Sequence, residues 1–261
     1  MEFLHRTWAE IDVDALVHNF GIIKKEAAGT KIMAVVKADA YGHSARNVAP
    51  LLEAEGADAF AVSNIEEAVT LRGCGITKPI LILGYTPVSM ASQLYINDIT
   101  QSVYSPEYAA ALSKKATADK VRIKIHIKLD TGMSRIGFDC RDNSLSGIDD
   151  ACAAARLPGF DFGGIFTHFA VSDRTPQEED GFTAAQYSRF IAAKERFIKA
   201  GLTPKICHCC NSAAFCLDTD KHLDMCRPGI ILYGLTPSSG LKLKEDFIPA
   251  MTVKSVVSMV K

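Results

Sequence analysis

The segment Ala34–Ser44, AVVKADAYGHS, places an amine at the end of an apolar run. The residues before it, Ile32–Val36, predict a buried strand that ends at Lys37. A lysine at a strand end is commonly a surface residue whose stem snorkels over the protein. At the mouth of a barrel, however, burial and nearby cations lower the pKa of the amine, which can then form a Schiff base. The carbonyl cofactor of such a lysine is typically pyridoxal 5′-phosphate.

Polar residues also end or follow the other apolar runs. They are Lys128 and Asp130 in 121–130, His168 in 160–170, Asn211 and Ser212 after 205–210, and Arg227, Pro228 and Gly229 in 223–234. Gly229 lets an anion approach bare backbone and Ser212 offers a hydroxyl, so with Ile230 they predict a phosphate site. Taken singly these signals are weak, because Pro-Gly usually marks a turn and Asn-Ser usually caps a helix. The prediction depends on their meeting at one face.

The elements that must position these residues alternate regularly between strand and helix. Apolar segments at 31–38, 58–63, 79–84, 99–104, 121–130, 160–170, 205–210 and 223–234 predict eight strands. Regular β-then-α units require parallel strands, since each helix returns the chain to the same end. Eight units in this length favour a closed (β/α)8 TIM-type barrel over an open doubly wound sheet, and active sites of such barrels lie at the carboxyl ends of the strands.

Local signals place several helix ends. Asp12 and Ser105 are predicted N-caps, and Pro106 suits the first helical position. Ser63 and Glu66 have the spacing of a capping box, which predicts that a helix begins directly after the strand at 58–63.

The last residues depart from the alternation. Residues 237–261 read as a linker and an alternating strand, which predicts a barrel domain over 1–236 and the start of a second, β-rich domain over 237–261. Alternatively, or in addition, the final strand pairs with the segment 7–13 near the N-terminus.

Composition excludes several classes of function. The 261 residues carry 29 basic and 30 acidic side chains, so the basic excess of a nucleic-acid or membrane-surface protein is missing. No apolar stretch is long enough to span a membrane, and the N-terminus lacks a secretory signal, so we expect a cytoplasmic protein. The eight cysteines are therefore expected to be free thiols. The run Cys207–Cys210 raises the alternative of zinc, but neighbours in a strand point to opposite faces and cannot converge on one ion, so no metal is expected.

Five segments together resemble one family. AVVKADAYGHS (34–44), KLDTGMSRIGF (128–138), THFA (167–170), CNSAA (210–214) and RPGIILYG (227–234) are similar to segments of alanine racemase, a pyridoxal-phosphate enzyme with a (β/α)8 N-terminal domain. The resemblance implies a catalytic set of Lys37, Arg135, His168 and Arg227, and a cofactor-binding set of Lys37, Tyr41, Asn211, Ser212, Arg227, Gly229 and Ile230.

The resemblance also implies individual roles. Lys37 would hold the cofactor as an internal aldimine and serve as one base, while Arg227 would face the pyridine nitrogen and hydrogen-bond His168. Arg135 would lie near the phenolic oxygen of the cofactor. Lys128 matches a position that is carbamylated in several members, where the carbamate orients the arginine.

The implied reaction interconverts L- and D-alanine and supplies D-alanine for peptidoglycan. The family's second base is a tyrosine of a C-terminal β domain, acting in the partner subunit of a homodimer, and no tyrosine here matches it. We therefore expect this chain to be truncated and to have little activity alone. Serine racemase of the same family and a non-enzymatic pyridoxal-phosphate carrier stay open as alternatives.

Overall fold

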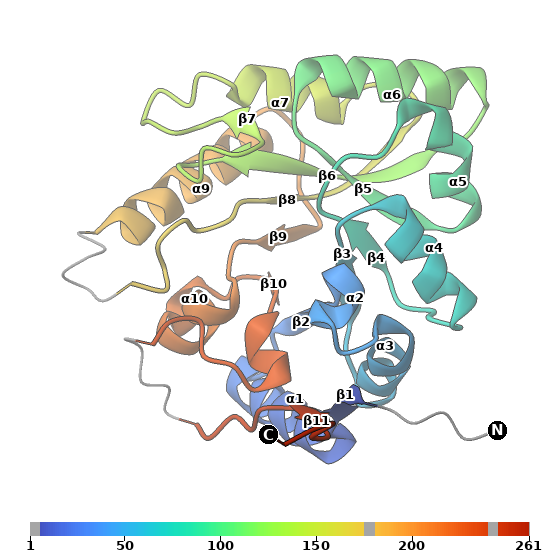
Figure 1. Ribbon diagram of the computed structural model, residues 1–261. Helices are drawn as coiled ribbons and strands as arrows, with labels where there is room; N and C mark the ends of the chain where they lie inside the picture. Colours follow the sequence, from blue (N-terminus) through green and yellow to red (C-terminus); the bar gives the residue numbers. More distant parts are fainter. Residues whose placement is uncertain (1–5, 175–180, 240–244, 261) are drawn as a thin grey trace.

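The computed structural model describes residues 6–174, 181–239 and 245–260. Residues 1–5, 175–180, 240–244 and 261, which fall within the two predicted domains, lie outside the described residues. Eight parallel strands form a nearly closed barrel with helices around it, which confirms the predicted TIM-type fold (Figure 1). In spatial order they are β10 (Met225–Cys226), β2 (Lys31–Val35), β3 (Ala59–Val62), β4 (Ile80–Ile82), β5 (Ile99–Val103), β6 (Ile123–Asp130), β8 (Phe160–Phe166) and β9 (Ile206–His208).

The barrel closes between β9 and β10 through contacts beside the strands. Asp224 N donates to Cys207 O at 3.2 Å, and the Asp224 carboxylate accepts from Cys207 N at 2.8 Å. After the two strands end, Arg227 N, which follows β10, donates to Cys210 O, which follows β9, at 3.0 Å. A ninth short strand, β7 (Phe138–Asp139), pairs with the end of β6.

Helices follow the strands as the alternation predicts. They are α1 (Val13–Ala27), α2 (Lys37–Tyr41), α3 (Ala45–Ala54), α4 (Ile65–Gly73), α5 (Ala91–Ile96), α6 (Pro106–Ala118), α7 (Ile148–Ala155), α9 (Phe182–Lys199) and α10 (Ser212–Leu217), with 3-10 turns η1 (Val88–Met90), η2 (Thr219–Lys221) and η3 (Ile230–Tyr233). The N-caps at Asp12 and Ser105 are confirmed, because each side chain accepts a backbone N–H of its helix.

The predicted capping box at Ser63 and Glu66 is wrong by one residue. Asn64 is the N-cap of α4, and its Oδ1 accepts from Glu67 N at 3.0 Å. Ser63 stays outside the helix because its backbone belongs to the loop that leaves β3. Asparagine caps a helix as well as serine does, so composition alone does not decide between adjacent candidates.

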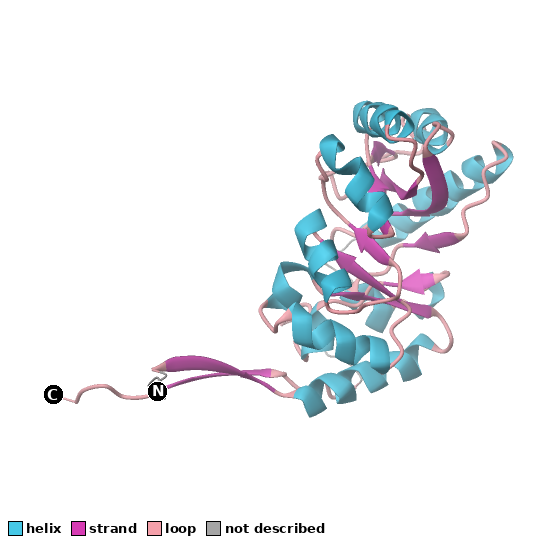
Figure 2. Cartoon of the chain, turned by 90° about the vertical axis from the view of Figure 1, so that its right-hand side faces the viewer, coloured by secondary structure: helices cyan, strands magenta, loops and turns pink. Residues whose placement is uncertain are grey.

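A two-stranded antiparallel ribbon extends away from the barrel (Figure 2). It pairs β1 (Thr7–Ile11) with β11 (Met251–Ser255) in the register Thr7↔Ser255 to Ile11↔Met251. This confirms the predicted pairing of the final strand with the segment at 7–13, and the separate sheet fits the start of a second domain. The domain boundaries at 1–236 and 237–261 stay a prediction.

Candidate active site

A cavity of about 540 Å³ opens at the carboxyl ends of the barrel strands. All of the predicted site residues line it: Lys37, Tyr41, Lys128, Arg135, His168, Asn211, Ser212, Arg227, Gly229 and Ile230. They come from segments that follow β2, β8, β9 and β10 and from the end of β6 and the loop after it. The volume is that of a typical small-molecule site, and parallel strands explain why distant segments meet there.

Lys37 begins α2, a short helical turn of unusual hand. Ala38, Asp39 and Ala40 have φ and ψ of 51° and 51°, 52° and 48°, and 55° and 47°, which are left-handed values. Left-handed helical backbone costs about 1–2 kcal/mol for each L-residue, or roughly 3–6 kcal/mol for these three. None of these three residues is glycine or asparagine, so the sequence gives no clear signal of a left-handed turn here. Strain of this kind persists only where contacts from other elements hold it.

The predicted phosphate residues come together at one end of the cavity. Gly229 N donates to Ser212 Oγ at 2.9 Å, which joins the segment after β10 to the start of α10. A Cβ atom at position 229 would lie 3.0 Å from the Tyr41 hydroxyl oxygen and 3.5 Å from Val35 Cβ. The missing side chain thus lets Gly229, Tyr41 and Ser212 lie close together, and their hydroxyl and backbone groups have the chemistry that a phosphate group requires.

Arg227 is buried in the floor of the cavity and is held from several sides. Its Nη2 donates to the backbone oxygens of Thr167 at 2.8 Å and Cys209 at 3.0 Å. Nη2 also lies 3.5 Å from His168 Nδ1, the contact expected from the resemblance. Burial lowers the pKa of His168 well below its ordinary value, and the Arg227 charge lowers that pKa further. His168 is therefore a neutral acceptor beside a permanent cation.

Two further histidines, for which the sequence predicts no role, extend the hydrogen bonds of Arg227 into the barrel. Arg227 Nη1 donates to His208 Nδ1 at 2.8 Å, and His208 Nε2 lies 2.9 Å from His126 Nδ1. Arginine can only donate, so His208 must carry its proton on Nε2 and donate it to His126. Gly164 in β8 leaves room for the His126 ring, since a Cβ there would lie 3.1 Å from its Nε2.

Lys128 is buried in the wall of the cavity. Its Nζ donates to Leu129 O at 3.1 Å and lies 5.2 Å from the Phe166 ring centroid. Burial lowers the pKa of this amine well below its ordinary value, and the charge of Arg227 acts in the same direction, against the opposing effect of Asp130. A lysine amine that loses its proton becomes a nucleophile.

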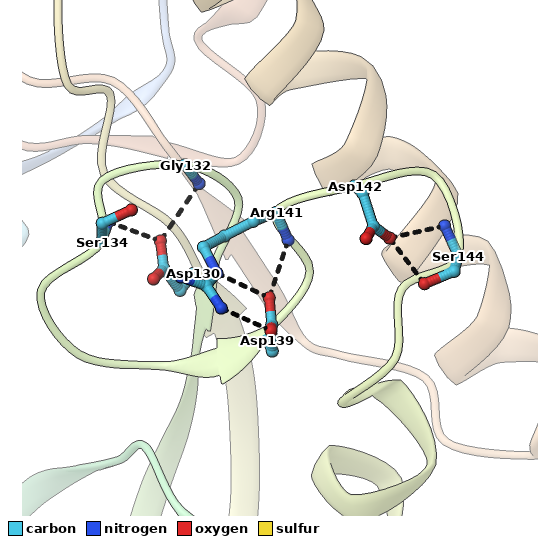
Figure 3. A network of polar contacts seen from close by, with 7 residues as sticks. All are labelled: Asp130, Gly132, Ser134, Asp139, Arg141, Asp142 and Ser144. Atoms are coloured by element: carbon cyan, nitrogen blue, oxygen red, sulfur yellow. Dashed lines mark hydrogen bonds and ion pairs between the residues drawn. The ribbon is translucent and has the colours of Figure 1, made fainter.

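Arg135 lines the cavity from the loop after β6. Figure 3 shows how Asp130, at the end of β6, contacts the backbone of this loop. The Asp130 carboxylate accepts from Gly132 N at 3.1 Å and from Ser134 N at 2.9 Å. The same turn carries Met133, which also lines the cavity. Asp130 thus shapes the loop rather than facing a ligand, which explains an acidic residue at the end of a buried strand.

Other lining residues carry no chemical signal in the sequence. They are Val35, Ser63, Leu83, Gly84, Met133, Ile136, Phe166, Phe169, Ala170, Asp173, Ala213 and Pro237. Most are apolar, as the walls of small-molecule sites usually are. Their place after successive strands is the only signal that could have found them. Among the described residues, no group of three or more histidine, cysteine, aspartate or glutamate side chains is placed to share a metal ion.

Fold and cavity together define a (β/α)8 barrel protein with a lysine-bearing site at the carboxyl ends of its strands. Residues 11–237 match the family model described as alanine racemase, N-terminal domain. The chain belongs to this family. No helix in the described part of the chain has the length and hydropathy that crossing a bilayer requires.

Relatives and solved structures agree with this assignment. The chain is 42% identical to alanine racemase of Clostridium tetani over 99% of its own length and 65% of the relative's. It is 40% identical to alanine racemase 2 of Caldanaerobacter subterraneus subsp. tengcongensis, over 98% and 64% of the two lengths. The structure of Clostridium difficile 630 alanine racemase in complex with cycloserine superposes with a TM-score of 0.90 and 38% identity, covering 100% of this chain and 70% of that one. The chain thus spans about 65% of the length of these curated relatives.

Proposed function

We propose that this protein is a pyridoxal-phosphate-dependent racemase of alanine. The observation that supports the proposal most is the convergence of Lys37, the Ser212–Gly229 corner and Arg227 on one cavity. An amine, an anion corner and a fixed cation are the three protein groups that such a cofactor needs. Curated relatives covering 99% and 98% of this chain are alanine racemases, which supports the same choice of substrate.

The residues present fit the cofactor. Tyr41, Ser212, Gly229 and Ile230 would hold its phosphate, Arg227 would face its ring nitrogen, and Lys37 would attach it; Asn211 and Arg135 complete the wall. When bound, pyridoxal phosphate supplies an electron sink that makes the Cα proton of an amino acid removable.

The chain's own groups would then move the proton and fix the charges. Lys37 would take or return the Cα proton on one face of the substrate. Arg227 cannot give up a proton, so it would hold the ring without protonating it, and the neutral His168 and His208 keep its guanidinium in place. We also propose that Lys128 becomes carbamylated and orients Arg135, because its low pKa leaves a nucleophilic amine beside that arginine.

Racemisation removes the proton on one face and returns it on the other, which calls for two bases. Lys37 is the base that we assign to one face of the substrate. We assign the second base to none of the described residues that line the cavity. We therefore expect the 261-residue chain alone to bind the cofactor but to racemise slowly. As in the expectation from the family, we propose a cytoplasmic homodimer that supplies D-alanine for peptidoglycan.

Isotope exchange tests this proposal and separates its alternatives. The protein loaded with pyridoxal phosphate is incubated in D₂O with each enantiomer of alanine and of serine, and loss of the Cα proton is followed by NMR. We expect exchange of alanine faster than its racemisation, with one enantiomer preferred, and no exchange in Lys37→Ala. Faster exchange of serine would favour serine racemase. Cofactor binding without any exchange would indicate a carrier, and racemisation at the rate of a longer relative would refute the need for a second base elsewhere.

A further inference from the structure

A single carboxylate joins two of the loops that form the cavity. Glu67 Oε1 accepts from Ala38 N at 2.8 Å, and Glu67 Oε2 accepts from Ser63 N at 2.7 Å. Ala38 directly follows Lys37, and Ser63 lines the cavity after β3. Glu67 itself is in the first turn of α4, so it reaches out of its own helix to both segments.

The Ala38 contact falls where the backbone most needs an outside partner. Ala38 is the first of the left-handed residues, and the N–H groups of a first helical turn have no acceptor within the helix. Asp39, the third residue of the same turn, accepts at its Oδ1 from the N–H of Ala45, the first residue of α3, at 2.7 Å. The strained turn is therefore held at its start by one carboxylate from α4, and its own aspartate ties it to the start of α3.

Capping explains only one of the two Glu67 carboxylate bonds. Glu67 is the third residue of α4 and reaches back past the N-cap to Ser63 N, much as in a capping box, whereas the bond to Ala38 N joins a different loop. The cap is supplied by Asn64, which accepts from Glu67 N at 3.0 Å and so also fixes the backbone of Glu67. The two carboxylate bonds both go to residues outside α4. Hydrogen bonds to a charged acceptor are about twice as strong as neutral ones, so the pair is suited to hold two loops in register.

We propose that Glu67 is a positioning residue for Lys37. By fixing the peptide that follows the lysine, it holds the backbone from which the amine enters the cavity, and by fixing Ser63 it ties this backbone to the neighbouring strand. The proposal rests on the proposed function, because it treats Lys37 as the point of cofactor attachment. It adds a residue that lies outside the lining of the cavity.

The test compares Glu67→Ala and Glu67→Gln with Glu66→Ala, a control that removes the adjacent exposed carboxylate of the same helical turn. Two quantities are measured: the rate of covalent attachment of pyridoxal phosphate to Lys37, trapped with borohydride and mapped by peptide mass, and amide exchange at Ala38 and Ser63. Attachment is expected to slow on the order of tenfold in Glu67→Ala, since bonds to a charged group are lost, and less in Glu67→Gln, which keeps one acceptor. Both amides should exchange faster while those of Ile80–Ile82 in β4 do not.

A second substitution separates positioning from general destabilisation. Ala38→Gly allows the left-handed backbone without strain, so in the Glu67→Ala background it should restore most of the attachment rate. A Glu67→Ala rate within twofold of wild type, or a loss that Ala38→Gly does not relieve and that Glu66→Ala shares, would overturn the proposal. If the wild-type protein attaches no cofactor at Lys37, the proposed function is refuted. If the wild type attaches the cofactor and Glu67→Ala attaches it equally fast, only the role of Glu67 is refuted.

Discussion

The left-handed turn after Lys37 predicts an unusual response to glycine. At Ala38 the side chain is exposed and the backbone has φ and ψ of 51° and 51°, so Ala38→Gly removes strain without removing buried surface. Removing the strain stabilises the folded protein by about 1–2 kcal/mol, and the greater conformational freedom of glycine in the unfolded chain offsets about 0.4–1 kcal/mol of this. The variant should therefore be more stable by about 1 kcal/mol, which corresponds to a rise in Tm of roughly 2–4 °C for a chain of this size.

The matched control is Ala110→Gly, at an exposed position of the right-handed helix α6. The same chemical change should there lower the free energy of unfolding by about 1 kcal/mol, so the two variants differ in sign. Urea unfolding followed by far-ultraviolet circular dichroism measures both. If Ala38→Gly loses as much stability as Ala110→Gly, the turn is not strained and the reasoning about its outside contacts is refuted.

Three further predictions concern the cavity and its surroundings. Gly229→Ala should weaken binding of pyridoxal phosphate by tenfold or more in a fluorescence titration, because its Cβ would lie 3.0 Å from the Tyr41 hydroxyl oxygen; an unchanged Kd would contradict the phosphate corner. Burial, helped by the Arg227 charge, lowers the pKa of His126 to about 4, so its NMR signals should not titrate between pH 8 and 5.5. The unfolded chain then binds an extra proton at His126 between pH 6.5 and 4, and this ring alone should lower the free energy of unfolding by up to about 3 kcal/mol as the pH drops through that window; an NMR titration midpoint near 6.5 would refute the buried neutral ring. With ¹³C-bicarbonate, Lys128 should give a carbamate carbon resonance that Lys128→Ala lacks, and equal spectra would exclude the modification.

The sequence predicted the barrel and the convergence of the site because both follow from short-range signals. An apolar run that ends in Lys37 and another that leads to Arg227 each mark the carboxyl end of a strand, and parallel strands bring such ends to one face. The alternating pattern of the final segment predicts a strand that needs a partner, but it leaves the segment 7–13 as one alternative beside a second domain; the structure pairs the two.

What could not be predicted depends on contacts between distant elements. The left-handed backbone at Ala38 is imposed from outside, since alanine has no intrinsic preference for it. The pairing of His126 with His208 joins residues 82 positions apart across the barrel, and neither residue is unusual in its own strand. A helix start that was misplaced by one residue hid Glu67, because the role of its carboxylate is visible only once Asn64 is known to be the cap.

Attachment of the cofactor at one lysine tests the central claim most directly. The chain is incubated with pyridoxal 5′-phosphate, reduced with borohydride and digested, and the modified peptide is identified by mass spectrometry. The account predicts one predominant label on Lys37, in the peptide that contains Ala34–Tyr41, and its loss in Lys37→Ala. A label spread over exposed lysines, or one concentrated on Lys128 with Lys37 unmodified, would contradict it.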